Sequence, residues 1–310
     1  MDIVREVIRT ENISKHYEDV RAVSDMSLSV RKGEIYGFLG LNGAGKTTTI
    51  RMLLGMIRPT SGSAYINDVK ISAGITELWK HVGSLVELPY SYPELTVREN
   101  LEIFRRLRFL SDKQSVDHVI NKLKLEIYAD RKAKDLSLGN NQRLGLAKAL
   151  MHNPDILILD EPANGLDPAG IFEIREMLCD LAANRGVTIF ISSHILGEIS
   201  RFATRIGIIH EGKLVQELDS ASLESLSRKR LLISAKNLKQ AQAILYQKGY
   251  KSELTEGNLL ELKNDDAIER PDVVATIMVN ADCPPTLLKV DEEDLETYFL
   301  RTIGVKGGLK

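Results

Sequence analysis

Apolar and polar residues alternate over the first 30 positions of the chain, with apolar side chains at Val7, Ile13, Val23 and Met26. A period of two is typical of strands that bury one face against a core. The pattern therefore predicts an antiparallel strand pair near the N-terminus, and we place the turn of this pair at Lys32-Gly33.

The next segment has the pattern of a strand, a glycine-rich loop and a helix. Residues 34–40 (EIYGFLG) are rich in β-forming side chains and lead through glycines into a helix predicted over 47–57. We expect this helix to stop at Arg58-Pro59, because the residue before a proline disfavours helical backbone angles.

Two short apolar runs farther along, at 155–160 (DILILD) and 187–193 (VTIFISS), predict strands that are buried on both faces of a parallel sheet. A helix is expected between them, over 169–186, and residues 96–128 show helical spacing without a strand signal. The first part of the chain is therefore expected to be an α/β domain with a helical insertion.

Past these strands the composition changes, and a polar and basic run (223–230) indicates a domain boundary. We expect one domain over residues 1–220 and a second over 221–310. The second has the element order βαββαβ, as in the split βαβ of ferredoxin-like folds, and then an amphipathic helix at 294–303. The tract Arg228-Lys229-Arg230 is interpreted as a solvated linker, with a membrane-surface patch as the alternative.

Composition excludes several classes of protein. Of 310 residues, 43% are hydrophobic and 27% charged, which is typical of a globular protein and not of a disordered, collagen-like or disulfide-stabilised one. A net charge of −2 offers no bulk positive field for nucleic acid. Cys179 and Cys283 cannot form a disulfide framework, which favours a reducing cytoplasm. The mean hydropathy of −0.13, with no long apolar window and a charged N-terminus, predicts neither a membrane span nor a signal peptide.

Residues Gly40 to Thr47 (GLNGAGKT) match the phosphate-loop pattern GxxxxGK[ST] in full, between a predicted strand and a predicted helix. Glycines let backbone N–H groups close on phosphates, and the start of the helix adds partial positive charge. Lys46 supplies a cation for the β- and γ-phosphates, and Thr47 supplies a hydroxyl for Mg²⁺. The predicted nucleotide-binding residues here are Gly40, Asn42, Gly43, Ala44, Gly45, Lys46, Thr47 and Thr48.

Asp160 and Glu161 stand at the end of an apolar strand, where open α/β sheets place their ligand crevice. On its own, such a pair is usually only a strand end. Combined with a complete phosphate loop, it predicts that Asp160 holds Mg²⁺ through water and that Glu161 accepts a proton from the attacking water. The two motifs indicate a nucleotide phosphohydrolase of the P-loop type.

Residues 136–143 (LSLGNNQR) resemble the signature sequence of ABC proteins, in a variant form with SLG followed by two polar residues and QR. From here, residues 1–220 as a whole resemble the nucleotide-binding domain of ABC transporters, which implies an ATPase. The resemblance implies that Ser137 and the Gly139 backbone meet a phosphate of the nucleotide held by a second copy.

The same resemblance implies roles for three further residues. Tyr17 corresponds to the aromatic that stacks on adenine, Asp167 to the D-loop, and His194 to the switch histidine that contacts the γ-phosphate. Each also has a simpler interpretation. Tyr17 could be a half-buried aromatic of a strand, and His194 could be a histidine at the edge of the sheet. Asp167 could be the N-cap of a helix that begins at Pro168, and this role is compatible with a role in the D-loop.

Three positions depart from the usual family pattern. Glu87 stands where most members have a glutamine that contacts Mg²⁺ and the membrane subunit, and Leu138 and Asn140 replace a glycine and a glutamine of the signature. A carboxylate still ligates Mg²⁺, so we count Glu87 as a catalytic and metal-site candidate, with a neutral surface substitution as the alternative. The sequence resembles a subgroup of ABC ATPases that export peptide antibiotics, in bacitracin-resistance and lantibiotic-immunity systems. The resemblance rests on Glu87, the SLG of the signature and the run ELTVRENL (94–101).

The resemblance implies a fold and an assembly. The expected fold is α/β: a P-loop ABC ATPase domain with a RecA-like core, an antiparallel β subdomain and a helical subdomain, followed by a small α+β ferredoxin-like domain. Because the chain carries one signature and one phosphate loop, we expect a homodimer that hydrolyses ATP with Mg²⁺. A separate membrane permease would dock beside Glu87 and the helical insertion, which places the chain at the cytoplasmic face of the cell membrane.

The alternative is a soluble ABC ATPase that acts on nucleic acid or ribosomes. Such proteins usually carry two nucleotide-binding domains, long coiled coils or zinc modules, and this sequence has none of these. A nucleotide sensor without a transport role is disfavoured by the intact Glu161.

Overall fold

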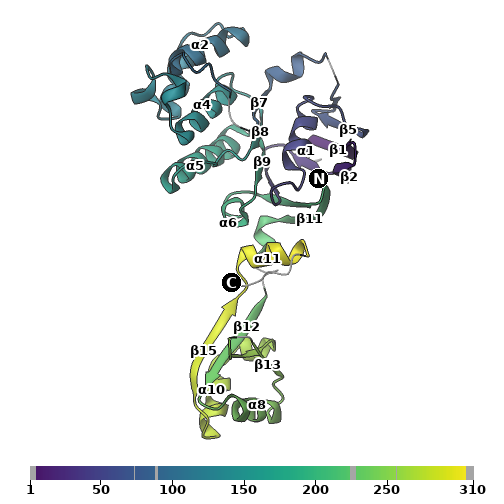
Figure 1. The fold of residues 1–310 in the computed structure, drawn as a ribbon, viewed down its shortest axis with the longest axis vertical. Helices are drawn as coiled ribbons and strands as arrows, with labels where there is room; N and C mark the ends of the chain where they lie inside the picture. Colours follow the sequence, from purple (N-terminus) through teal and green to yellow (C-terminus); the bar gives the residue numbers. More distant parts are fainter. Residues whose placement is uncertain (1–4, 73, 88–89, 224–227, 256, 305–310) are drawn as a thin grey trace. The chain divides into compact units, whose positions relative to one another are not determined.

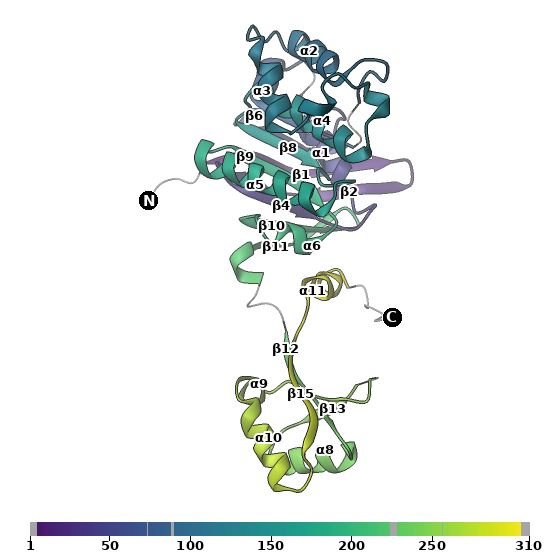
Figure 2. The ribbon, with the colours of Figure 1, turned by 90° about the vertical axis from the view of Figure 1, so that its left-hand side faces the viewer.

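The computed structural model describes residues 5–72, 74–87, 90–223, 228–255 and 257–304. The chain divides into two compact units, Met1–Ser222 and Leu223–Lys310, each with its own buried apolar cluster (Figures 1 and 2). Part of the polar run at 223–230 lies outside the described residues.

The first unit is built on a six-stranded sheet in the order β11-β10-β4-β9-β8-β7. Its strands are β4 (Ile35–Leu39), β7 (Val82–Leu85), β8 (Ile156–Asp160), β9 (Thr188–Ser193), β10 (Arg205–His210) and β11 (Lys213–Asp219). All neighbours are parallel except β10 and β11. Every residue of β4, β8 and β9 is buried, which explains their continuous apolar runs.

Helices cover both faces of this sheet. Figure 1 shows α1 (Lys46–Leu53) on one side and α5 (Pro168–Arg185) on the other, while the short α6 (Leu196–Ile199) follows β9. The α/β fold predicted for this part of the chain is therefore confirmed.

A second, antiparallel sheet contains β1 (Glu6–Tyr17), β2 (Val20–Met26), β3 (Ser29–Arg31), β5 (Ser61–Ile66) and β6 (Val69–Lys70). The predicted strand pair is β1 and β2, but the predicted turn is wrong. Tyr17 pairs with Val20, so the turn is Glu18-Asp19, and Lys32-Gly33 instead connects β3 to β4 of the other sheet. Alternation reveals strands, but it does not reveal which strands pair.

The helix α1 ends at Leu53, earlier than predicted. Gly55 adopts a φ of 66°, its N–H donates to the Met52 carbonyl, and the Met56 N–H donates to the Arg51 carbonyl. This pair of bonds is a Schellman cap, which closes the helix through a left-handed glycine. Gly55 therefore ends the helix before the chain reaches Pro59.

The helical insertion is confirmed. It contains α2 (Val97–Leu107), which starts with a capping box formed by Thr96 and Glu99, then α3 (Gln114–Lys122) and α4 (Leu138–Leu150). Short 3₁₀ turns lie at Glu77–Lys80, Glu126–Tyr128, Ala133–Asp135 and Ser220–Ser222.

The second unit has a four-stranded antiparallel sheet in the order β13-β14-β12-β15, which is the split βαβ arrangement. Its elements are β12 (Lys229–Ala235), α8 (Leu238–Gln247), β13 (Ser252–Leu254), β14 (Leu260–Leu262), α9 (Asp265–Glu269), α10 (Pro271–Asn280), β15 (Pro285–Glu292) and α11 (Leu295–Thr302). The linker interpretation of the basic tract is wrong from Lys229 onward, because β12 begins there and Arg230 pairs with Asp291 at 2.9 Å.

Candidate functional site

The phosphate loop connects β4 to α1 and is shaped by left-handed glycines. Gly43 and Gly45 have φ values of 82° and 108°, and a Cβ on Gly45 would lie 2.5 Å from the Ala22 carbonyl oxygen. Glycine is required at position 45 for both reasons. No side chain caps the start of α1, so its first N–H groups face the loop without a side-chain acceptor.

Lys46, the first residue of α1, is almost fully buried, with 6% of its side chain exposed. Its Nζ donates to the Gly40 carbonyl at 2.7 Å and lies 3.2 Å from Glu161 Oε1. The ammonium group is thus held at the loop, opposite the carboxylate of the residue that follows β8. A phosphate in this loop would meet a cation that is already in place.

Asp160 ends β8 and receives a hydroxyl on each oxygen. Thr47 Oγ1 donates to Oδ2 at 2.7 Å, and Ser192 Oγ donates to Oδ1 at 2.6 Å. A threonine hydroxyl and a carboxylate that converge in this way are the hard oxygen donors that Mg²⁺ prefers. Among the described residues, no three His, Cys, Asp or Glu side chains form a metal-binding group.

Glu161 contacts two other residues that the sequence singled out, His194 and Lys46. Its Oε2 lies 2.8 Å from His194 Nδ1, its Oε1 lies 3.2 Å from Lys46 Nζ, and 17% of its side chain is exposed. A carboxylate with little solvent contact, held between an imidazole and an ammonium group, is suited to accept a proton from a positioned water.

These groups open onto one cleft of about 560 Å³. Of the predicted residues it is lined by Asn42, Gly43, Gly45, Lys46, Thr47, Thr48, Glu161 and His194. Val20 to Ala22 of β2, Asn164 and Glu211 also line it. The sequence indicated Asn164 only as part of the D-loop and Val20 to Ala22 only as part of a strand, and no pattern indicated Glu211.

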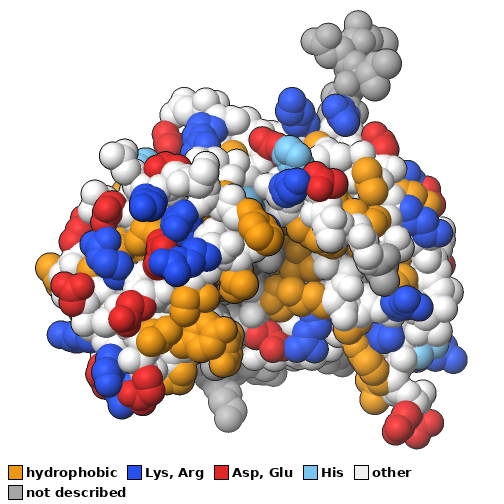
Figure 3. All heavy atoms as spheres, turned by 90° about the horizontal axis from the view of Figure 1, so that it is seen from above, with side chains coloured by type: hydrophobic (Ala, Val, Ile, Leu, Met, Phe, Trp, Pro, Cys, Tyr) orange, Lys and Arg blue, Asp and Glu red, His pale blue; other side chains and the backbone are white. Residues whose placement is uncertain are grey.

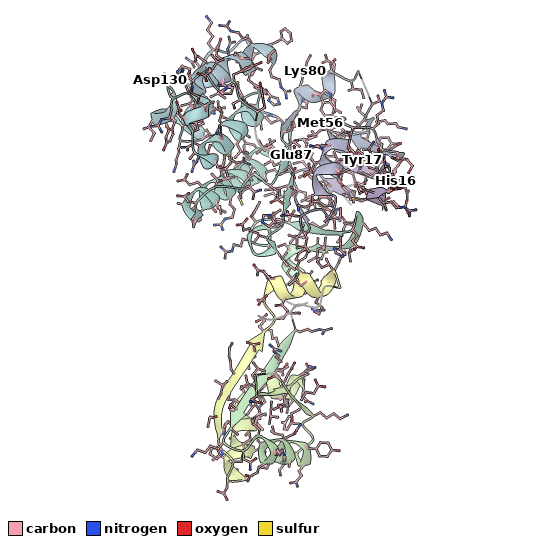
Figure 4. The ribbon with its side chains drawn as sticks, in the orientation of Figure 1. His16, Tyr17, Met56, Lys80, Glu87 and Asp130 are labelled. Atoms are coloured by element: carbon pink, nitrogen blue, oxygen red, sulfur yellow. The ribbon has the colours of Figure 1, made fainter. Side chains whose placement is uncertain are left out.

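Tyr17 and Glu87 are among the predicted residues that do not line this cleft. Tyr17 ends β1, is 43% exposed, and has Lys15 Nζ at 5.0 Å from its ring centre. Glu87 follows β7 with a φ of 55° and pairs with Arg51 Nη2 at 2.6 Å (Figure 4). Both residues are accessible on the first unit. The structure does not test their predicted roles.

The signature packs on the D-loop of its own chain, residues 164–168. Ser137 caps α4 by accepting the Asn140 N–H at 3.2 Å, and a Cβ on Gly139 would lie 2.9 Å from the Gly165 carbonyl oxygen. Asp167 caps α5 by accepting the Gly170 N–H at 2.8 Å, as its simpler interpretation predicts. Neither Ser137 nor Gly139 lines the cleft of the same chain.

Two basic side chains in the first unit, outside the cleft lining, have strongly shifted pKa values. Burial lowers the pKa of Lys148 to about 8, and its Nζ donates to the Tyr90 carbonyl at 2.7 Å and to Ser91 Oγ at 2.9 Å. It thereby anchors the segment that follows the Glu87 loop. Burial also lowers the pKa of His152 to about 4, and its Nε2 lies 3.1 Å from the Val82 carbonyl oxygen.

A family model described as ABC transporter matches residues 23–164. The bacitracin transport ATP-binding protein BcrA of Bacillus licheniformis is 39% identical over 300 residues, which are 96% of this chain and 97% of that protein. The lantibiotic transport ATP-binding protein SrtF of Streptococcus pyogenes is 37% identical over 229 residues, 73% of this chain and 98% of that protein.

Among solved structures, the ATP-binding cassette MJ0796 in a dimeric, post-hydrolysis state bound to ADP and Pi is similar to this chain. The match has a TM-score of 0.64 and 25% identity, and it covers 69% of this chain and 98% of that one. Among the described residues, no helix combines the length and the apolar character that crossing a bilayer requires.

Proposed function

The chain belongs to the ABC transporter family as an ATP-binding, ATP-hydrolysing subunit, and from this premise we propose that it powers a separate permease that exports a peptide antibiotic. One observation carries the catalytic part of the proposal. Thr47 Oγ1 lies 2.7 Å from Asp160 at the end of β8, and Lys46 Nζ lies 3.2 Å from Glu161, the next residue. His194 completes the group at 2.8 Å from Glu161.

The roles follow from position. Loop N–H groups and Lys46 bind the β- and γ-phosphates, Glu161 accepts the proton of the attacking water, and His194 orients the γ-phosphate. Tyr17 would stack on adenine from the end of β1. Its exposed ring is available for that contact.

Mg²⁺ fits the oxygen donors at this site. Thr47 would hold it through its hydroxyl and Asp160 through water, with Glu87 as a further candidate from the loop after β7. When bound, the ion neutralises phosphate charge as the γ-phosphoryl leaves. A site of one hydroxyl and one carboxylate, completed by phosphates and waters, is the usual form of magnesium binding to nucleotides.

A homodimer is proposed because the signature lies away from the cleft of its own chain. Ser137 and Gly139 would contact the γ-phosphate held by the partner, with Asp167 at the same interface. The dimeric state of MJ0796 supports this arrangement. Each cleft would therefore be completed only when two copies close on ATP.

The permease is proposed to dock where the Glu87 loop and the helical insertion meet, which places the chain at the cytoplasmic face of the membrane. Large apolar side chains exposed on these segments are Tyr90, Tyr92, Leu107 and Phe109, and Met56 is exposed after α1. Figure 3, which views the end of the first unit that carries α2, shows apolar side chains gathered in a hollow among charged ones. An exposed apolar surface of this kind is typical of a protein contact.

The peptide-antibiotic substrate is proposed from the relatives. BcrA, by its name a bacitracin transport protein, aligns over nearly the whole length of both chains, so the match includes the second unit. SrtF aligns over 98% of its own length but only 73% of this chain. We therefore favour a bacitracin-like cargo over a lantibiotic.

The proposal is tested with the chain and its membrane partner. Purified protein should hydrolyse ATP in the presence of Mg²⁺, and Lys46→Ala should abolish nucleotide binding. Affinity purification from detergent extracts should recover an integral-membrane protein in stoichiometric amount. A deletion strain should become sensitive to bacitracin. Hydrolysis without a membrane partner would contradict the transport role, and loss of resistance to lantibiotics alone would contradict the choice of cargo.

A further inference from the structure

The backbone of Glu161 adopts a conformation that glutamate disfavours. Its φ is 49°, in the left-handed region, where a side chain larger than that of glycine crowds the backbone. Asn and Asp tolerate this region because their short side chains bond the local backbone, but glutamate has no such compensation. The surrounding structure must therefore hold this residue in place.

Two buried side chains hold the peptide groups on either side of the Glu161 Cα. Ser192 Oγ accepts the Glu161 N–H at 3.0 Å, and Gln142 Nε2 donates to the Glu161 carbonyl at 3.2 Å. Ser192 is fully buried and Gln142 is 2% exposed. Water competes poorly with bonds this well shielded, so they restrict the backbone strongly.

The two side chains come from different elements and neither lines the nucleotide cleft. Ser192 belongs to β9, and its hydroxyl also donates to Asp160 Oδ1, whereas Gln142 belongs to α4. The helix α4 begins at Leu138 in the signature, with Ser137 as its N-cap. Gln142 thus links the helix of the signature directly to the backbone of Glu161.

We propose that Gln142 and Ser192 are positioning residues that clamp Glu161 in its left-handed conformation and so set the rate of ATP hydrolysis without touching ATP. The inference rests on the proposed role of Glu161 as the proton acceptor. Rotation of the Glu161 backbone would swing the carboxylate away from His194 and Lys46. A displacement of about 1 Å at a reacting group costs on the order of 100-fold in rate.

Gln142→Met is the cleanest perturbation, because it keeps the side-chain length, removes the donor and leaves Asp160 untouched. Turnover of ATP at saturation should fall roughly 10- to 100-fold, while the ATP dissociation constant stays within about threefold of the wild type. In a Glu161→Gln background, adding Gln142→Met should cause no further loss of residual turnover. A residue that acts only through Glu161 has nothing left to position there.

Ser192 provides an independent arm. Ser192→Ala should lower turnover in the same way, and Ser192→Thr, which keeps the hydroxyl on a strand, should restore most of it. Thr188→Val is the matched control, because Thr188 is almost equally buried at the other end of β9. Among the described residues, its hydroxyl accepts the Gly33 N–H at 3.0 Å and bonds neither Asp160 nor Glu161. This control should leave turnover unchanged.

Unchanged turnover in both Gln142→Met and Ser192→Ala would overturn the clamp. A fall in turnover that is matched by weaker ATP binding, or that adds fully to Glu161→Gln, would overturn it as well, because that result indicates a general loss of structure. A wild-type protein that binds ATP but does not hydrolyse it would instead contradict the proposed function.

Discussion

Glu161→Gln is the substitution that separates proton transfer from nucleotide binding at this site. The amide keeps the shape of the carboxylate but loses its negative charge and its ability to take a proton. Because only 17% of the Glu161 side chain is exposed, bulk water has little access to the site and cannot readily take the proton in place of the carboxylate. General base catalysis contributes about 10²- to 10⁴-fold, so ATP turnover should fall by about that factor.

Binding of ATP should survive the same change. Lys46 keeps its bond to the Gly40 carbonyl at 2.7 Å and loses an anion at 3.2 Å that competes with phosphate for its charge. The affinity for ATP should therefore be equal to that of the wild type or tighter. With turnover blocked, ATP-bound protein should accumulate as a dimer.

The assays are phosphate release at saturating ATP, nucleotide affinity by fluorescence, and molar mass by light scattering with ATP and Mg²⁺. Glu211→Gln is the control, because it makes the same exchange in the same cleft on a side chain that is 84% exposed and lies near His210 instead. Turnover of Glu161→Gln close to that of the control would refute the assignment of the base. A protein that stays monomeric with ATP would refute the shared site.

Four further outcomes are expected. Ser137→Arg should abolish turnover without weakening ATP binding to the isolated chain, since the signature serves the partner's nucleotide; weaker binding by fluorescence would contradict this. Glu87→Ala should impair resistance in cells more than basal hydrolysis, and Glu87→Gln should shift the Mg²⁺ titration. Because the exposed pair with Arg51 is worth only about 0.2–1 kcal/mol, neither variant should lower the melting temperature much. Truncation after Ser222 should leave a folded, ATP-binding fragment, because that unit has its own apolar cluster, and an insoluble fragment would contradict it. Burial lowers the pKa of His152 from 6.5 to about 4, so between these values the unfolded state binds a proton that the folded state does not. Stability should therefore fall as the pH drops from 6.5 to 4, by about 1–2 kcal/mol once partial exposure is allowed for, and urea titrations of His152→Gln should lack this loss.

Local sequence patterns were enough to predict the elements whose chemistry is local. The phosphate loop is identified by glycines and Lys46 at fixed spacing between a strand and a helix, because a left-handed loop tolerates few other residues. Likewise, β8 and β9 are continuous apolar runs because a strand buried on both faces has no polar side. The βαββαβ order of the second unit follows from periodicity in the same way.

Which of these local elements contact one another depends on the tertiary fold. Thr47 and Asp160 share a hydrogen bond across 113 positions because β4 and β8 both lie beside β9, and strand order is a long-range property that a local pattern does not encode. The hairpin turn at Glu18 was mispredicted for the same reason. The two bonds to the Glu161 backbone could not be predicted from the sequence either. Gln142 and Ser192 have the pattern of an ordinary helix residue and an ordinary strand residue, and only tertiary packing brings both to the same backbone.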